Sequence, residues 1–105
     1  MKVALIDYGA GNLRSVANAL RELGVEPVIA AAPQDLTGAT HHILPGVGSF
    51  GDCMAQLDQR GLTRAILGWV SAGKPYLGIC LGYQILFDDS EETPGVRGLG
   101  VVPGT

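Results

Sequence analysis

Short, continuous apolar runs divide this chain. They occupy 2–7 (KVALID), 26–31 (EPVIAA), 41–46 (HHILPG), 74–80 (KPYLGIC) and 99–104 (LGVVPG). Runs without regular polar alternation are typical of strands whose two faces are both covered. Glycine, proline and polar residues between the runs supply the turns that such strands need. The pattern therefore predicts five strands of a largely parallel sheet.

Helical periodicity lies between these runs. Apolar residues recur at spacings of three and four over 13–24, with Asn12 as a candidate N-cap and Gly24 as a candidate stop. Further helices are expected over 49–61, 62–73 and 81–89, and 33–39 is expected to be a short connection. Alternating strands and helices predict a doubly wound, flavodoxin-like α/β fold, with helices on both faces of a parallel sheet ordered 2-1-3-4-5. We treat 1–105 as one domain.

Composition excludes several classes of protein. Hydrophobic residues make up 47% of the 105 residues, as in a globular core, and the net charge of -3 gives no reason to expect nucleic acid or an anionic membrane as partner. No apolar stretch approaches the ~20 residues of a membrane-spanning helix, and the N-terminus does not resemble a signal peptide. Two cysteines without a disulfide pattern indicate a reducing, cytoplasmic setting.

One cysteine stands at the end of the fourth apolar run. Cys80 lies in GICLG, between Gly78 and Gly82, where a predicted strand passes directly into a predicted helix. This pattern is the thiol version of the nucleophile elbow G-x-S-x-G, a tight turn that lifts its central side chain above the sheet. Glycines are needed on both sides because strand and helix approach closely. At a helix N-terminus the thiol pKa would be lowered, and the Leu81 N–H could bind an oxyanion.

The remaining cysteine and the histidines have a simpler interpretation. A free cysteine is often only a small buried hydrophobe, and we assign that role to Cys53, on a predicted helix face. His41 and His42 are the only histidines, and they begin the third predicted strand. They would lie near the amino edge of the sheet, one strand length away from Cys80, so we do not assign either as its base.

Three further patterns each lack a required residue. GAGNLR (9–14) begins like a dinucleotide-binding motif, but Arg14 replaces the third glycine. GWVSAGKP (68–75) begins like a P-loop, but Pro75 replaces the serine or threonine and the segment precedes a strand. The histidines and cysteines are not spaced as zinc ligands, and DDSEE (88–92) is expected to be a solvated loop. We therefore expect no metal and no cofactor.

Three segments carry a family resemblance. YGAGNLRSV (8–16), LPGVGSFGDCM (44–54) and GKPYLGICLGYQILFDDSEE (73–92) resemble the glutaminase subunits of imidazole glycerol phosphate synthases. Those subunits are class I, or triad, glutamine amidotransferases of histidine biosynthesis. The resemblance runs from Lys2 to Gly104, and PGVGSFGD is its most specific part.

The resemblance implies roles for particular residues. Cys80 would attack the side-chain amide of glutamine, giving a glutamyl thioester and ammonia. Val47 and Leu81 would supply two main-chain donors to the oxyanion, after a peptide flip that Gly46 tolerates. The positions that match the family's glutamine-binding residues are Gly46, Gly48 and Gln84.

The resemblance also implies a partner. Ammonia would pass to a (β/α)8 cyclase subunit, which would use it to build imidazole glycerol phosphate. The positions that match the family's cyclase-facing loop are Gly9, Gly11, Asn12 and Arg14.

The catalytic base is expected outside this chain. Family members carry the histidine and its carboxylate in an H-P-E-like motif in their second half, whereas this chain ends at Thr105. We therefore expect an amino-terminal half with negligible glutaminase activity alone. An interrupted sheet has an unpaired edge, so we expect either a homo-oligomer or pairing with a complementing carboxy-terminal half.

Two alternatives remain open at this point. The chain could be a non-catalytic α/β scaffold that keeps the elbow without using it. It could also belong to another amidotransferase branch, such as a pyridoxal-phosphate synthase glutaminase, although PGVGSFGD and YGAGNLRS argue against that branch.

Overall fold

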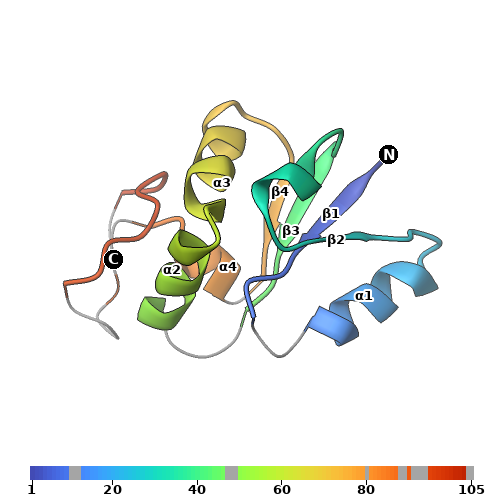
Figure 1. The fold of residues 1–105 in the computed structure, drawn as a ribbon, viewed down its shortest axis with the longest axis horizontal. Coiled ribbons are helices and arrows are strands. Elements are labelled where there is room, and N and C mark those ends of the chain that lie inside the picture. Colours follow the sequence, from blue (N-terminus) through green and yellow to red (C-terminus); the bar gives the residue numbers. More distant parts are fainter. Residues whose placement is uncertain (10–12, 47–49, 80, 88–89, 91–94, 104–105) are drawn as a thin grey trace.

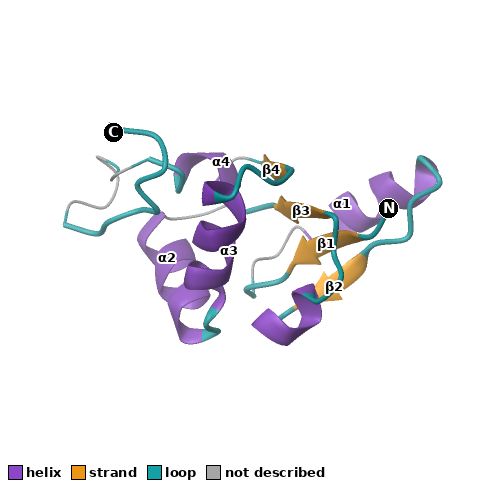
Figure 2. Ribbon diagram, turned by 90° about the horizontal axis from the view of Figure 1, so that it is seen from above, coloured by secondary structure: helices purple, strands orange, loops and turns teal. Residues whose placement is uncertain are grey.

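The chain folds into three layers, with a sheet between two sets of helices. The computed structural model describes residues 1–9, 13–46, 50–79, 81–87, 90 and 95–103. Helix α1 (Leu13–Glu22) covers one face of the sheet, and α2 (Phe50–Gln59) and α3 (Leu62–Ser71) cover the other (Figure 1). The view from above separates the same layers, with α1 behind the strands and α2 and α3 beside them (Figure 2). Helices on both faces explain why the strand sequences are apolar without alternation.

Parallel pairing sets the order of the strands. They are β1 (Val3–Ile6), β2 (Val28–Ala30), β3 (His41–Leu44) and β4 (Tyr76–Gly78), and the 3-10 turn η1 (Pro33–Leu36) follows β2. All pairs are parallel in the order β2-β1-β3-β4, and Leu44 lies opposite Gly78. The predicted doubly wound, flavodoxin-like α/β fold is confirmed, as are the first four places of the predicted strand order.

Each face of the sheet has its own apolar cluster. Val3, Leu5 and Ile43 pack with Ala17 of α1 on one face. The larger cluster lies on the other face and joins Ile6, Leu44, Phe50, Leu57, Leu62, Ile66 and Ile85. All four residues of β1 are buried because this central strand contributes side chains to both clusters.

The last predicted helix is shorter than the sequence pattern suggested. Helix α4 covers only Leu81–Gln84, whereas we predicted a helix over 81–89. The carbonyl of Ile85 accepts a hydrogen bond from the N–H of Leu99 at 2.7 Å, and that of Leu86 accepts one from Val102 at 2.9 Å. The C-terminal segment thus takes acceptors that a longer helix would need for itself.

The predicted fifth strand is wrong for the described residues. Residues 99–103 do not extend the sheet beside β4; their bridge is a single parallel pair, Phe87 with Val102. The segment is drawn to 85–87 by a close backbone approach at Gly98, where a Cβ atom would lie 2.3 Å from the Phe87 carbonyl oxygen. Only glycine fits there. Among the described residues, β4 is therefore an edge strand.

The described helices were also compared with the length of a bilayer. Among the residues that the structure covers, no helix is long and apolar enough to cross a membrane.

Candidate active site

Three strands of interest, β1, β3 and β4, end at the carboxyl edge of the sheet. Because the strands are parallel, the residues that follow β1, β3 and β4 emerge at this edge, where doubly wound folds bind ligands. After β1, the Asp7 carboxylate accepts a hydrogen bond from the Gly9 N–H at 2.9 Å, and Gly9 has φ +95°. After β3, Gly46 is buried. Asp7 therefore stabilises the turn after β1. The main chain that follows β1 and the main chain that follows β3 begin at the same edge of the sheet.

The turn between β4 and α4 packs directly on the end of β3. The Ile79 N–H donates to the Leu44 carbonyl at 3.0 Å, and the Gly82 N–H donates to the Ile79 carbonyl at 3.1 Å. A Cβ atom on Gly82 would lie 1.8 Å from the Leu44 carbonyl oxygen. No side chain can occupy that position without moving main-chain atoms. The predicted reason for a glycine after the cysteine, close approach of helix and strand, is confirmed at Gly82.

A tyrosine that the sequence analysis did not single out ties this turn to the strand before it. The half-buried Tyr76 hydroxyl donates to the Gly82 carbonyl at 2.5 Å. The Tyr76 ring packs against the large apolar cluster beneath α2 and α3. Burial raises the pKa of Tyr76, so the hydroxyl keeps its proton and remains a donor. A tyrosine in an apolar strand gives no sequence signal for this contact.

The predicted site residues fall into two groups. Gly46 follows β3, Leu81 begins α4, and Gln84 ends α4 with an exposed side chain. Gly9 and Arg14 are exposed at the loop that follows β1 and at the start of α1. The turn contacts bring 44–46 and 79–82 together. The predicted residues that lie outside the described part of the chain are Cys80, Val47, Gly48, Gly11 and Asn12.

The histidines lie at the opposite edge of the sheet. His42 pairs with Tyr76 at the start of β4, so the turn at Ile79 is about 10 Å further along the strand. His42 is 2% exposed, its ring stacks on Trp69 with centroids 3.7 Å apart, and neither ring nitrogen has a hydrogen-bond partner within the described part of the chain. Burial and, to a smaller extent, the Lys74 ammonium lower its pKa to about 4. His42 is thus too far from the turn at 79–82, and too weakly basic, to deprotonate a cysteine there.

A second buried tyrosine lies in the same cluster as Tyr76. Tyr8 is 4% exposed, and no nitrogen or oxygen atom of the described residues is hydrogen-bonded to its hydroxyl. The buried thiol of Cys53 is its neighbour, and burial raises the pKa values of both groups. Cys53 is thus an inert buried thiol in the core, as predicted.

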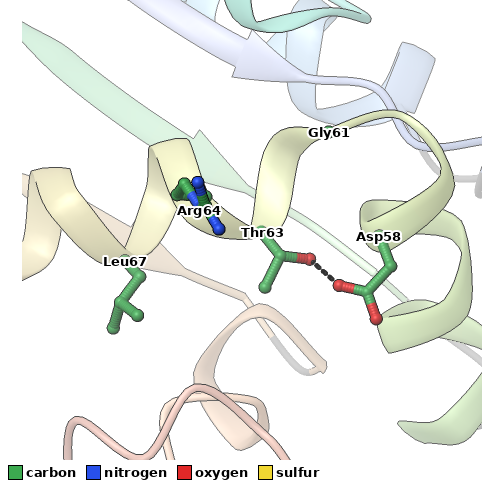
Figure 3. A pocket seen from close by; sticks show the side chains of 5 residues that line it. All are labelled: Asp58, Gly61, Thr63, Arg64 and Leu67. Atoms are coloured by element: carbon green, nitrogen blue, oxygen red, sulfur yellow. Dashed lines mark hydrogen bonds between the residues drawn. The ribbon is translucent and has the colours of Figure 1, made fainter.

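A surface hollow of about 410 Å³ lies where α2 turns into α3 (Figure 3). In it, the Thr63 hydroxyl points toward and donates to the Asp58 carboxylate, which partly satisfies that group. Arg64 and Leu67 complete the wall with Gly61. It holds none of the predicted site residues, and we assign it no chemistry. Within the described ranges, no cluster of three or more metal-ligating side chains occurs.

A second hollow, of about 280 Å³, is almost wholly apolar and lies between α1 and the open end of the sheet. Leu77 of β4 is 54% exposed at its rim, although it is a large aliphatic side chain on an edge strand. Its other apolar walls include Val3, Leu20, Val25 and Ile43. Among the described residues, the part of this face formed by Leu77 of β4 is not covered by α1.

The fold and the turn define the class of protein. Residues 4–97 match the family described as glutamine amidotransferase class-I, so the chain belongs to this family. The family resemblance seen in the sequence motifs is confirmed at the level of the class.

Curated relatives narrow the comparison. The chain is 52% identical to the imidazole glycerol phosphate synthase subunit HisH of Methanothermobacter thermautotrophicus over 102 residues, which make up 97% of this chain and 50% of the relative. It is 50% identical to the same subunit of Halalkalibacterium halodurans, covering 97% of this chain and 48% of that protein. In the chloroplastic imidazole glycerol phosphate synthase hisHF of Arabidopsis thaliana it is 49% identical and covers 17% of the protein. The chain spans about half the length of the Methanothermobacter and Halalkalibacterium subunits.

Solved structures show the same fold at low identity. A crystal structure of a glutamine amidotransferase superposes with a TM-score of 0.81 at 24% identity, covering 96% of this chain and 53% of the other. A putative peptidase E from Listeria monocytogenes superposes with a TM-score of 0.71 at 19% identity. These likenesses support the fold alone.

Proposed function

We propose that this chain is the amino-terminal half of the glutaminase unit of an imidazole glycerol phosphate synthase. In this role Cys80 is the nucleophile and glutamine is the substrate. The ammonia released serves a (β/α)8 cyclase partner in histidine biosynthesis. The similarity to HisH subunits over 97% of the chain supports the assignment, and so do the motifs at the carboxyl edge of the sheet.

The proposed reaction has two balanced steps. The Cys80 thiolate attacks the side-chain carbonyl carbon of glutamine, the C–N bond breaks, and ammonia leaves after the nitrogen takes up a proton. Water then hydrolyses the thioester, giving glutamate and restoring the thiol. Both tetrahedral intermediates carry an oxyanion, for which we propose the N–H groups of Leu81 and Val47. The Gly82 N–H donates to Ile79, and we propose the neighbouring Leu81 N–H at the start of α4 as the oxyanion donor.

One observation carries this proposal from the described residues. The turn 79–82 rests on the Leu44 carbonyl so closely that a Cβ at Gly82 would lie 1.8 Å away. That contact holds Gly82 against the end of β3, which supports our proposal that Cys80 acts beside the segment that follows Leu44. A nucleophile and an oxyanion donor must come from these two segments if they are to act on one carbonyl.

The remaining glutamine and partner contacts are part of the same proposal. Gly46, Gly48 and Gln84 would hold glutamine, and Gln84 is exposed at the end of α4, where a bound molecule could reach it. The cyclase would dock on the loop with Gly9, Gly11, Asn12 and Arg14. The Arg60 guanidinium lies 3.3 Å from the place of a Cβ on Gly9, so it borders this surface. The free, buried thiol of Cys53 suits a reducing, cytoplasmic compartment.

The catalytic base has to come from outside these residues. The only histidines are at the opposite edge of the sheet, and His42 is buried and weakly basic. We propose that the segment of relatives that this chain does not match supplies the base, and that it packs against β4 and the apolar hollow beside Leu77. A second copy of this chain is the alternative occupant of that edge.

Ammonia release tests the function. The chain is mixed with the unmatched half of the M. thermautotrophicus relative, glutamine is added, and ammonia is followed against each half alone. We expect no turnover above background from the 105-residue chain and measurable turnover from the pair. Cys80→Ala should abolish that turnover, whereas Cys53→Ala, which removes the buried thiol, should retain most of it.

Covalent labelling gives a second readout of the same site. A diazoketone analogue of glutamine should label Cys80 in the pair and leave Cys53 unmodified. Turnover that survives Cys80→Ala, or turnover by the lone chain, would contradict the proposal. Absence of both labelling and turnover in a stable pair would favour the non-catalytic scaffold.

A further inference from the structure

The turn that carries the proposed nucleophile is held by a side chain from the strand before it. The Gly82 carbonyl accepts from the Tyr76 hydroxyl at 2.5 Å, across six residues of chain. A helix of only four residues leaves most of its carbonyls without the partner that a longer helix supplies. Tyr76 satisfies one of these acceptors. Its ring is fixed in turn by the apolar cluster that includes Phe50 and Leu57.

Three hydrogen bonds hold the turn between β4 and α4: two between main-chain groups, and one from the Tyr76 side chain. The Ile79 N–H is bound to Leu44, and the Gly82 N–H is bound to Ile79. Without the Tyr76 hydroxyl, Gly82 would keep its close packing on the Leu44 carbonyl, but its own carbonyl would lose this hydrogen bond and would be freer to rotate. The Gly82 carbonyl belongs to the first turn of α4, which also contains the Leu81 N–H. Fixing that carbonyl therefore limits rotation of the turn that presents the Leu81 N–H.

We propose that Tyr76 is a positioning residue of the glutaminase site, and that its hydroxyl holds the first turn of α4 so that Cys80 and the Leu81 N–H face the same carbonyl. This inference rests on the proposed function for the identity of the nucleophile. It does not depend on the complementing half. Tyr76 itself does not touch the substrate in this account.

The chain offers a matched control in Tyr8. It is a tyrosine of the same cluster, and its hydroxyl lies beside the buried thiol of Cys53, whereas the Tyr76 hydroxyl binds the Gly82 carbonyl. Tyr76→Phe and Tyr8→Phe each remove one hydroxyl and keep the ring. A merely structural role for Tyr76 predicts that both variants change only the overall stability.

Two measurements on the 105-residue chain separate these outcomes. Tyr76→Phe should speed amide hydrogen exchange at 81–86 about fivefold relative to the rest of the chain, because a neutral hydrogen bond of typical strength is lost there. The pH midpoint for alkylation of Cys80 by iodoacetamide should move up toward the ~8.5 of a free cysteine. Tyr8→Phe should leave both values as in the unsubstituted chain.

Equal behaviour of the two variants in exchange and alkylation would overturn the inference. So would a Tyr76→Phe chain that keeps the exchange rates at 81–86 and the alkylation midpoint. A Cys80 midpoint that is already at ~8.5 before substitution would instead count against the proposed nucleophile, while the exchange comparison would still decide the role of Tyr76. In the assembled pair, Tyr76→Phe should lower kcat more than it raises KM for glutamine.

Discussion

Gly82 and Gly68 both lie in helices, but only Gly82 is packed closely against main-chain atoms, so alanine at the two positions should have opposite effects on stability. A Cβ on Gly82 would lie 1.8 Å from the Leu44 carbonyl oxygen, whereas a Cβ on Gly68, within α3, would meet nothing within 4 Å. Gly82→Ala should therefore lower the free energy of unfolding by at least about 2 kcal/mol, because main-chain atoms must move. Gly68→Ala should raise it by about 0.5–1 kcal/mol.

Urea unfolding of both variants checks this prediction. The difference in midpoint should have opposite signs for the two alanines at similar m-values. If Gly82→Ala unfolded at the same urea concentration as the unsubstituted chain, the close packing of α4 on β3 would be disproved.

A buried histidine makes the stability of the chain sensitive to acid. Burial lowers the pKa of His42 from 6.5 to about 4 in the folded state, so the unfolded chain binds more protons between these values. The free energy of unfolding should be fully present above pH 6.5 and should fall as the pH drops toward 4. The loss from this group is about 3 kcal/mol at most. Below pH 4 His42 contributes no further slope.

Variants at the two adjacent histidines isolate this effect. His42→Phe keeps a ring against Trp69 and removes no hydrogen bond, so it should flatten the stability profile between pH 6.5 and 4. His41→Phe should keep the slope, because His42 is retained. Denaturant titrations at pH 7, 6, 5 and 4 measure both profiles, and a slope that persists in His42→Phe would assign it to other groups.

At the scale of elements, the sequence pattern predicted most helices and strands correctly, because the apolar positions that define the pattern are the ones that become buried. The apolar run at the start of the chain became β1, buried on both faces, and the helical pattern after it became α1, which ends where Gly24 adopts φ +84°. The helix α4 was overestimated because its apolar residues continue a helical pattern. Long-range pairing of Ile85 with Leu99 overrides that pattern, and nothing near position 85 announces it.

The candidate site was predictable to the extent that it depends on backbone geometry. The motif around Cys80 identified Gly82 because close packing forbids a side chain, which is a local requirement. The role of Tyr76 was not predictable, since its partner depends on how β4 and α4 meet in space. The role of the histidines could be excluded in advance because strand length alone places them at the other edge.

The exposed edge of the sheet yields a prediction about association. Leu77 is 54% exposed on β4, and Leu67, on the outer face of α3, is 36% exposed. If the edge beside the apolar hollow is an association surface, Leu77→Lys should suppress it, because a lysine on an edge strand opposes strand addition. Leu67→Lys is the matched control and should have no effect.

Sedimentation over a range of concentrations tests the edge. The unsubstituted chain should self-associate when it is alone. When the complementing half is added, the chain should bind that half instead. Leu77→Lys should weaken both by about tenfold or more, as expected for a buried unpaired charge. Equal association of the Leu77→Lys and Leu67→Lys chains would place the contact elsewhere.

For the molecule as a whole, the proposed nucleophile and the histidines belong to opposite edges of the sheet. At the carboxyl edge, Ile79 and Gly82 lie against Leu44 at the end of β3, whereas the weakly basic His42 lies at the amino edge. If Cys80 is the nucleophile, as proposed, its reactivity can be measured separately from turnover. Thiol reactivity measured on this chain and ammonia release measured on the pair report different parts of the same mechanism.

The order β2-β1-β3-β4 places the first strand of the chain inside the sheet and the last one at its border. A strand added by a complementing piece at β4 would need a single new ladder of main-chain hydrogen bonds and would leave the three existing ones whole. Such a seam suits a two-piece biosensor, in which each piece is fused to one of two interacting proteins and glutamine cleavage signals that they have met.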